Sequence, residues 1–523
     1  MKKAPPRTGR AAIFVAAGIL VSRLAGLVRI RAFAHYFGLS DEGDAFNAGF
    51  RIPNFLQNLF GEGALSASFI PVYASLVARG DKRESDRVAG AVASLLALVV
   101  SGLVLVGVLA TPVLIDVIAP GFSGAKRELT IQIVRILFPG AGLLVLSAWC
   151  LGVLNSHGRF LLSYMAPVVW NAAMIASLIV YGSSTLPQLA IRLAWGSVIG
   201  SALQIAVQLP VVLRVAPDLK LAFDTASDHV RTVVRNFAPA FLSRGVVQIS
   251  AYIDALIASL LPTGAVTALT NAQLLYTLPV SLFGISVSAA ELPAMSGAMG
   301  ADRTTAETLR QRLNSGLRRI AFFVVPSAVA FMALGDVIAA ALLETGRFTP
   351  SDAVYVWMIL AGSGIGLLPS TLGRLYSSSY YALRDTRTPL RYALIRVALS
   401  TVMGYLFAIT LRRALGIPAL YGAAGLTISS GMAGWTEMLL LRRTMNIRIG
   451  RTGVPWNYML KLWAAAVVGA GIAWLVKLAL PAMHPALAGI LILGTYGIVF
   501  LGLTLVVHIP EAASVASRIR SRL

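Results

Sequence analysis

The sequence predicts an all-α protein that crosses a membrane many times, with two parallel six-helix lobes around a central cavity. Its apolar composition, its alternating loop charge and an internal duplication support this prediction. Of its 523 residues, 57% are hydrophobic and only 13% are charged, whereas a soluble globular chain carries about 25% charged residues. Apolar runs long enough to cross a bilayer as helices recur along almost the whole length.

The apolar runs and the Gly-, Pro-, Ser- and Asp-rich connectors between them predict about fourteen membrane spans. The expected spans cover residues 11–37, 44–78, 89–118, 129–154, 160–181, 189–212, 237–261, 266–293, 317–343, 352–382, 389–411, 420–441, 457–480 and 485–508.

Lysine and arginine alternate between the two sides of these spans. The N-terminus, every second loop and the C-terminal tail hold about 29 of the 44 basic residues, and the opposite loops hold about six. By the positive-inside rule, both termini are expected in the cytoplasm. The formal charge of +22 is thus explained by loops that face anionic lipid, and it gives no reason to expect nucleic acid as a partner.

Few features suggest metal or disulfide chemistry. The single cysteine, Cys150, lies in an apolar run, and the five histidines lack ligand spacing. The apolar run after "MKKAPPRTGR" is interrupted by Arg23, Arg29 and Arg31, so we expect an uncleaved first span rather than a signal peptide.

The chain contains an internal duplication at offsets of about 220–222 residues. The matches are Ser22-Arg23 with Ser243-Arg244, Ile70-Pro71 with Leu292-Pro293, "DVIA" at 116–119 with 336–339, and Pro167 with Pro389. Each copy holds six spans, an even number, so the copies share one orientation and are expected to enclose a cavity. We therefore expect an N-terminal lobe at 1–220, a C-terminal lobe at 221–445, and two added helices with a basic tail at 446–523.

Cations inside the expected spans outnumber acids. The cations are Arg23, Arg29, Arg31, Arg51, Arg135, Arg244, Arg374, Arg396 and Lys477, and the acids are Asp44, Glu62, Asp254, Glu291 and Glu437. A charge at the bilayer centre costs a few kcal/mol, so it faces a cavity or a partner. The surplus of guanidinium groups predicts an anionic ligand, because these groups bind phosphate oxygens in bidentate fashion.

The intramembrane charges also have a structural interpretation, in which they snorkel to the interface or pair with one another. We favour it for Arg31, Arg135, Arg396 and Lys477, and a cavity role for Arg23, Arg29 and Arg244, which would approach from opposite lobes. Glu62, in "FGEGALSASFIP", is either a coupling or gating acid or an arginine's partner.

Several segments resemble the MurJ/MviN family of lipid II flippases. They are "SRLAGLVR", "DAFNAGFRIPNFLQNLFGEGALSASFIPVY", "VIAPGF", "ETGRFTPSD" and "YYALRDTRTP", in the family's order along essentially the whole chain. The resemblance implies a fold of two six-helix lobes plus two extra helices, within a wider exporter superfamily. It also implies transport of the undecaprenyl-pyrophosphate-linked peptidoglycan precursor from the inner to the outer leaflet of the bacterial cytoplasmic membrane, with the headgroup in the cavity.

By the same resemblance, the family's cavity residues match particular positions here. They are Arg23, Arg29, Asp44, Arg51, Glu62 and Arg374, and Arg244 joins them as the repeat mate of Arg23. This chain departs from the family at two positions, Gln57 and Leu274, where members commonly carry arginine. These departures leave a different anionic polyprenyl-linked glycan, or a small molecule, as an alternative substrate.

The sequence contains no GxxxxGK[ST] motif, which would bind ATP. We therefore expect transport by alternating access without a cofactor, driven by membrane potential, an ion gradient or the substrate gradient. The sequence does not identify a coupling ion. A remoter alternative is a membrane enzyme that acts on polyprenyl phosphates. Such an enzyme usually needs clustered carboxylates for Mg²⁺ or a nucleophile with a nearby base, and the acids here are too dispersed to suggest either. A third alternative is a non-transporting scaffold for cell-wall machinery, which would have no need of cavity charges. Expected partners are lipid II, membrane lipids and cell-wall synthesis machinery.

Overall fold

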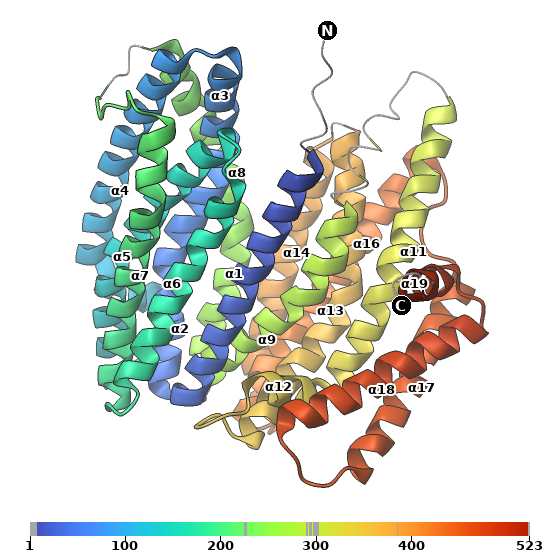
Figure 1. Cartoon of the computed structure of the whole chain (residues 1–523). Helices are drawn as coiled ribbons and strands as arrows, with labels where there is room; N and C mark the ends of the chain where they lie inside the picture. The colour runs from blue at the N-terminus through green and yellow to red at the C-terminus, as the bar shows by residue number, and fades with distance from the viewer. Residues whose placement is uncertain are drawn as a thin grey trace. The chain divides into compact units, whose positions relative to one another are not determined.

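The computed structural model describes residues 8–223, 227–288, 291, 295, 303–383 and 385–520 of the chain. Within these residues, side chains are described except at 8–17, 19, 53, 61–63, 238–251, 285, 303–305 and 518–520. The described chain is all-helical, as predicted, and divides into two units (Figure 1). Unit 1 comprises residues 1–264 with 345–347, and unit 2 comprises residues 265–344 with 348–523.

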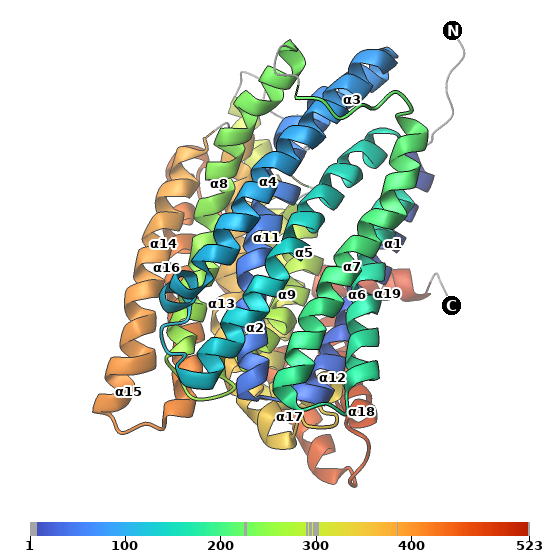
Figure 2. The same ribbon diagram turned by 90° about the vertical axis from the view of Figure 1, so that its left-hand side faces the viewer.

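Unit 1 contains eight α-helices and one π-helical segment among its described residues. They are α1 (Thr8–Phe37), α2 (Asp41–Leu56), the π segment η1 (Gln57–Leu65), α3 (Ser66–Arg79), α4 (Lys82–Ile118), α5 (Gly124–Ser156), α6 (Phe160–Tyr181), α7 (Leu186–Val215) and α8 (Asp228–Ser259). Helix α5 packs against α2, α4 and α7, α1 packs on α6, and α8 packs on α3 and α4. Figure 2 shows α4 and α8 side by side.

Unit 2 begins with α9 (Ala265–Pro279) and a second π segment, η2 (Val280–Ile285). The elements that follow are α11 (Arg303–Ala333), α12 (Gly335–Leu343), α13 (Pro350–Ala382), α14 (Arg387–Tyr405), η3 (Leu406–Thr410), α15 (Leu411–Ala414), η4 (Ala419–Tyr421), α16 (Gly422–Ile449), α17 (Trp456–Ala479), α18 (Pro485–Val506) and α19 (Pro510–Arg520). Helix α13 is central, because it packs against α9, α11, α12 and α16. The α17–α18 pair rests on α11 and α12.

The expected spans agree closely with these helices. The span predicted at 160–181 is α6 itself, and 352–382 differs from α13 by two residues. Ten of the described helices are long and apolar enough to cross a membrane. Helices α1, α2–η1–α3, α8 and α16 account for the other expected spans, so fourteen crossings are consistent with the structure but are not established by it.

One expected span is wrong as a single helix. The run 317–343 breaks at Leu334, which separates α11 from α12. Two indoles satisfy the carbonyls that the break frees: Trp357 donates to Met332 O at 3.0 Å, and Trp474 donates to Ala333 O at 2.8 Å. Because both tryptophans come from other helices, the local apolar pattern contains no signal of the break.

Two glycines allow α13 and α16 to approach each other closely in unit 2. A Cβ atom on Gly366 of α13 would lie 2.7 Å from the Cα of Gly431 on α16. Helices in lipid associate through such close backbone approach, because lipid tails give no hydrophobic drive for helix association. The Gly366–Gly431 contact therefore fixes how α13 and α16 pack.

Unit 1 and the predicted N-terminal lobe differ by one helix. The sequence repeat starts a new copy before α8, whereas the packing places α8 with α3, α4 and η1 in unit 1. Arg23 and Arg244 therefore belong to the same unit. The division into two six-helix lobes stays a prediction from the repeat.

The carboxylate of Asp385 holds the start of α14. It accepts hydrogen bonds from the amides of Arg387 and Thr388 at 3.1 and 3.0 Å and from the Thr388 hydroxyl at 2.7 Å, and it pairs with Arg448 at 2.7 Å. The bonds from Thr388, opposed by desolvation and aided by Arg448, lower the pKa of Asp385 to about 2. This explains why "RDTRTP" carries an acid two residues before the helix begins at Arg387.

We expect Gly90→Ala to destabilise the protein, because its Cβ would lie 2.1 Å from the carbonyl oxygen of Lys220. The backbone must shift, at a cost of about 1–3 kcal/mol. Gly102→Ala, on the same helix with no atom within 4 Å, is the matched control and should be neutral or slightly stabilising. Thermal unfolding in detergent measures both, and equal midpoints for the two variants would contradict the packing described.

We expect Asp385→Asn to remove a stabilising contribution that depends on pH. Because folding lowers the pKa of Asp385, its contribution is complete above its ordinary value of 3.8 and is lost as pH falls toward 2. At pH 7 the variant should lose about 1–2 kcal/mol, after allowance for solvent screening. Unfolding measured from pH 7 to pH 3 should show the gap between wild type and variant closing; a constant gap would contradict this account.

Candidate functional site

The start of α2 is fixed by its own sequence. The Ser40 hydroxyl accepts a hydrogen bond from the Gly43 amide at 3.1 Å, which caps the helix. Asp41, Glu42 and Asp44 occupy the first turn, where the helix dipole favours negative charge. The acids of this turn are thereby held in fixed positions.

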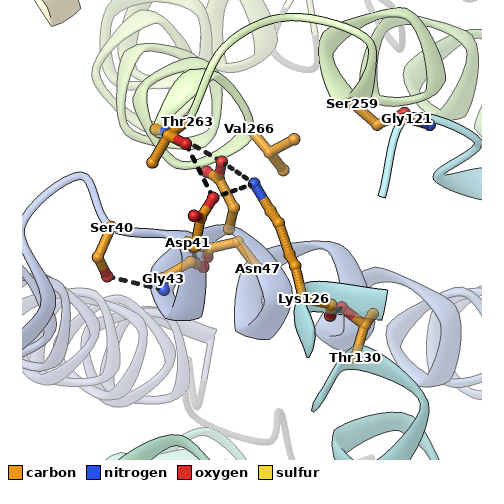
Figure 3. Close-up of polar contacts among 12 residues, drawn as sticks. Ser40, Asp41, Gly43, Asn47, Gly121, Lys126, Thr130, Ser259, Thr263 and Val266 are labelled. Atoms are coloured by element: carbon orange, nitrogen blue, oxygen red, sulfur yellow. Dashed lines mark hydrogen bonds and ion pairs between the residues drawn. The ribbon is translucent and has the colours of Figure 1, made fainter. Parts of the chain in front are cut away.

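Two of these acids, Asp41 and Asp44, pair with a lysine from the start of α5; Figure 3 shows Lys126 pointing toward Asp41. Lys126 Nζ lies 2.8 Å from Asp41 Oδ1 and 2.9 Å from Asp44 Oδ2. Thr263 donates to Asp41 at 2.9 Å, and the Gly264 amide donates to Asp44 at 2.8 Å. We call Asp41, Asp44, Lys126, Thr263 and Gly264 the Lys126 cluster; it joins the first turns of α2 and α5 to the loop after α8.

Asp44 is the buried centre of the Lys126 cluster. Its side chain is 1% exposed, against 16% for Lys126, so its charge must be compensated within the protein. Gly264 has φ +86°, and a Cβ there would lie 2.8 Å from Leu39 Cβ. Only glycine meets both demands at this position, so the cluster depends on backbone as well as on charge.

Arg29 lies beside two aromatic rings in unit 1, those of Phe50 and Trp170, which stack on each other. Its Nε donates to Asn171 Oδ1 at 2.9 Å, and its guanidinium carbon lies 5.2 Å from the Trp170 ring centre and 5.9 Å from that of Phe50. Among the described residues it makes no other hydrogen bond. The rings fix the guanidinium plane, and the terminal nitrogens are left for a further acceptor.

The other predicted site residues lie in different settings. Arg23 of α1 and Arg374 of α13 are exposed, and neither makes an ion pair with a described side chain. Arg51 is half-buried, and its carbonyl accepts from the Tyr252 hydroxyl at 2.5 Å. Glu62 lies in η1 and Arg244 in α8, but their side chains lie outside the described part.

A π segment interrupts the corresponding helix of each repeat. η1 follows α2, and η2 follows α9, at nearly the repeat offset. Such segments widen a helix by one residue per turn and occur often at functional sites. Glu62 lies inside η1, so the candidate coupling or gating acid is part of a π segment.

The sequence did not predict Lys126, Asn171, Trp170 or Thr263 as partners of the site residues. A signal existed for Lys126, since it is one of few cations on the cation-poor side of the expected topology. Asn171 and Trp170 lie in an apolar run that gives no such signal. Two of the cations interpreted as structural do pair with acids: Arg396 with Glu437 at 3.2 Å, and Lys477 with Asp336.

The chain is similar to known proteins both in sequence and in fold. The family model described as "Lipid II flippase MurJ" matches residues 33–507. The chain belongs to the MurJ family. It is 32% identical over 472 residues to "Lipid II flippase MurJ" of Burkholderia cenocepacia, covering 88% of this chain and 89% of that one. It is 31% identical over 477 residues to "Probable lipid II flippase MurJ" of Rhizobium tropici, covering 88% and 86%.

Solved structures share the fold. "Lipid II flippase MurJ, inward closed conformation" aligns at a TM-score of 0.78 and 24% identity, over 95% of this chain and 99% of that one. An inward-facing multidrug resistance MATE family transporter of the MOP superfamily aligns at 0.66 and 17% identity, over 83% and 98%. This chain therefore shares its fold with both solved structures, and with its ten apolar helices it is a multi-pass membrane protein.

We expect Lys126→Met to destabilise the protein by about 3–5 kcal/mol, because it leaves the buried Asp44 carboxylate without its cation. The matched control is Arg127→Met. Arg127 pairs with the largely exposed Asp116 at 2.7 Å, and solvent screening leaves such an exposed pair little effect on stability. Adding Asp44→Asn to Lys126→Met should restore part of the loss. Equal thermal midpoints for Lys126→Met and Arg127→Met would contradict the buried role of Asp44.

Proposed function

We propose that this chain carries lipid II from the inner to the outer leaflet of the bacterial cytoplasmic membrane. The observation that carries the proposal is the match to the lipid II flippase family model over residues 33–507. The relative of Burkholderia cenocepacia bears the same description at 32% identity. The ten apolar helices support a protein embedded in the bilayer, and the loop charges support cytoplasmic termini.

The arginines of α1 support the binding of a pyrophosphate. Arg23 is exposed, and Arg29 presents a guanidinium fixed by Trp170 and Asn171. Two such groups about 1.7 helical turns apart along α1 suit an extended anionic headgroup. We keep Arg51, Glu62, Arg244 and Arg374 in the proposed binding set, and we assign Asp44 to holding the ends of α2, α5 and α8 together.

Transport in this proposal proceeds by alternating access and makes or breaks no bond in the lipid. Its energy comes from membrane potential, an ion gradient or the substrate gradient. Cell-wall synthesis enzymes that consume lipid II are the expected neighbours in the membrane. Gln57, at the start of η1, and Leu274, half-buried in α9, favour a second candidate, in which the cargo is another anionic polyprenyl-linked glycan.

We expect this chain to sustain growth of a bacterium depleted of its own lipid II flippase and to restore lipid II in the outer leaflet. Arg23→Ala should lower outer-leaflet lipid II by about tenfold or more, as expected when a charge-assisted contact to phosphate is lost. Its thermal midpoint should not change, because the Arg23 side chain is exposed.

Arg135→Ala is the matched control, since Arg135 is also an exposed arginine inside an expected span. It should support growth like the wild type. Rescue by Arg23→Ala equal to that of the wild type would refute the binding role of Arg23. A well-expressed wild type that fails to restore lipid II would instead favour a different cargo.

A further inference from the structure

A face near the C-terminal end of α16 combines apolar side chains with guanidinium groups. Leu439, Arg443 and Ile447 recur every fourth residue, so they lie on one side of the helix. Leu439 is 50% and Ile447 80% exposed, and Arg443 is exposed. With Arg442 and Asn446 these residues line an open pocket of about 450 Å³. We call these five residues the α16 pocket.

The loop that follows α16 folds back against the α16 pocket. Arg442 Nε donates to the carbonyl of Thr452 at 3.0 Å, and Asn446 Oδ1 accepts from the Thr452 amide at 2.7 Å and from its hydroxyl at 2.5 Å. These bonds hold Arg442 and Asn446 in place. The pocket therefore has fixed polar groups at one end.

Two features place this pocket at the level of lipid headgroups. Trp456 begins α17 just after the loop and is 77% exposed; exposed tryptophans at helix ends mark the membrane interface. In the other direction along α16, exposed Met432 and Leu439 form an apolar surface suited to acyl chains. The face thus passes from apolar to basic at Arg443.

The charge around the α16 pocket is positive. Arg442, Arg443, Arg448 and Arg451 lie within ten residues of one another. Asp385 pairs with Arg448, whereas Arg442 and Arg443 form no ion pair with a described side chain. A helix C-terminus itself repels anions, so the attraction for an anion must come from these two guanidinium groups.

We propose that the α16 pocket binds the headgroup of an anionic phospholipid of the cytoplasmic leaflet. Its phosphate would lie on Arg442 and Arg443, and one acyl chain would run along Leu439. A soluble phosphate would gain nothing from the apolar residues beside the arginines. A zwitterionic lipid would gain little from the positive charge. The combination of both surfaces therefore selects a lipid that is both anionic and anchored in the bilayer.

The test measures binding of phosphatidylglycerol and of phosphatidylcholine to the full chain in detergent, by native mass spectrometry. We expect the wild type to prefer phosphatidylglycerol and Arg443→Gln to bind it about fivefold more weakly, which corresponds to about 1 kcal/mol. Arg413→Gln is the matched control. Arg413 is an exposed arginine at the end of α15, and in the expected topology it lies on the side of the membrane opposite to the α16 pocket. This variant should leave binding unchanged.

Other outcomes overturn the proposal. Thermal unfolding first checks that Arg443→Gln and Arg413→Gln are folded. If Arg443→Gln then binds phosphatidylglycerol as tightly as the wild type does, a site at Arg443 is refuted. Equal binding of the two lipids would refute charge selection. Displacement of phosphatidylglycerol by millimolar inorganic phosphate would show that the acyl chain contributes nothing. Displacement by a polyprenyl pyrophosphate at equimolar concentration would reassign the pocket to the transport substrate. Because binding is measured without transport, these outcomes are independent of the proposed flippase activity.

Discussion

A charge withdrawn from water needs a partner, and this constraint organises the polar side chains of the chain. The buried Asp44 carboxylate is compensated by Lys126 and by the Gly264 amide. The Arg29 guanidinium lies on Trp170 and binds Asn171. In an apolar environment each of these charges would otherwise cost several kcal/mol. The partners therefore determine which helices meet at these points.

The same constraint governs the backbone. Where α11 ends at Ala333, the freed carbonyls accept hydrogen bonds from the indoles of Trp357 and Trp474. Trp474 belongs to α17, so one of the two added helices supplies a hydrogen-bond donor to the break between α11 and α12, which lies inside the repeat. Without such donors, irregular backbone at this depth would be too costly in lipid. The added helices are in this respect part of the core of unit 2.

The sequence predicted the helices well because span length and apolar runs are local properties. The 160–181 run and α6 share both ends. It predicted less of the site, since contacts such as Arg29–Asn171 join residues 142 positions apart. The sequence missed the break at Leu334 and the Lys126 cluster for the same reason. In both, the side chains that form the hydrogen bonds come from segments distant in the chain. Asp44 illustrates the difference: the family resemblance predicted it as a cavity acid, whereas the sequence did not predict its contacts with Lys126 and Gly264.

The duplication also shows how one motif can acquire different partners. In the first copy, Asp116 of "DVIA" lies in the last turn of α4 and pairs with Arg127, eleven residues later. In the second copy, Asp336 lies in the first turn of α12 and pairs with Lys477 of α17, 141 residues later. Its other carboxylate oxygen is buried without a hydrogen bond from the described residues. The second copy thus draws its cation from outside the repeat, so the added helices are attached to unit 2 by an ion pair as well as by apolar packing.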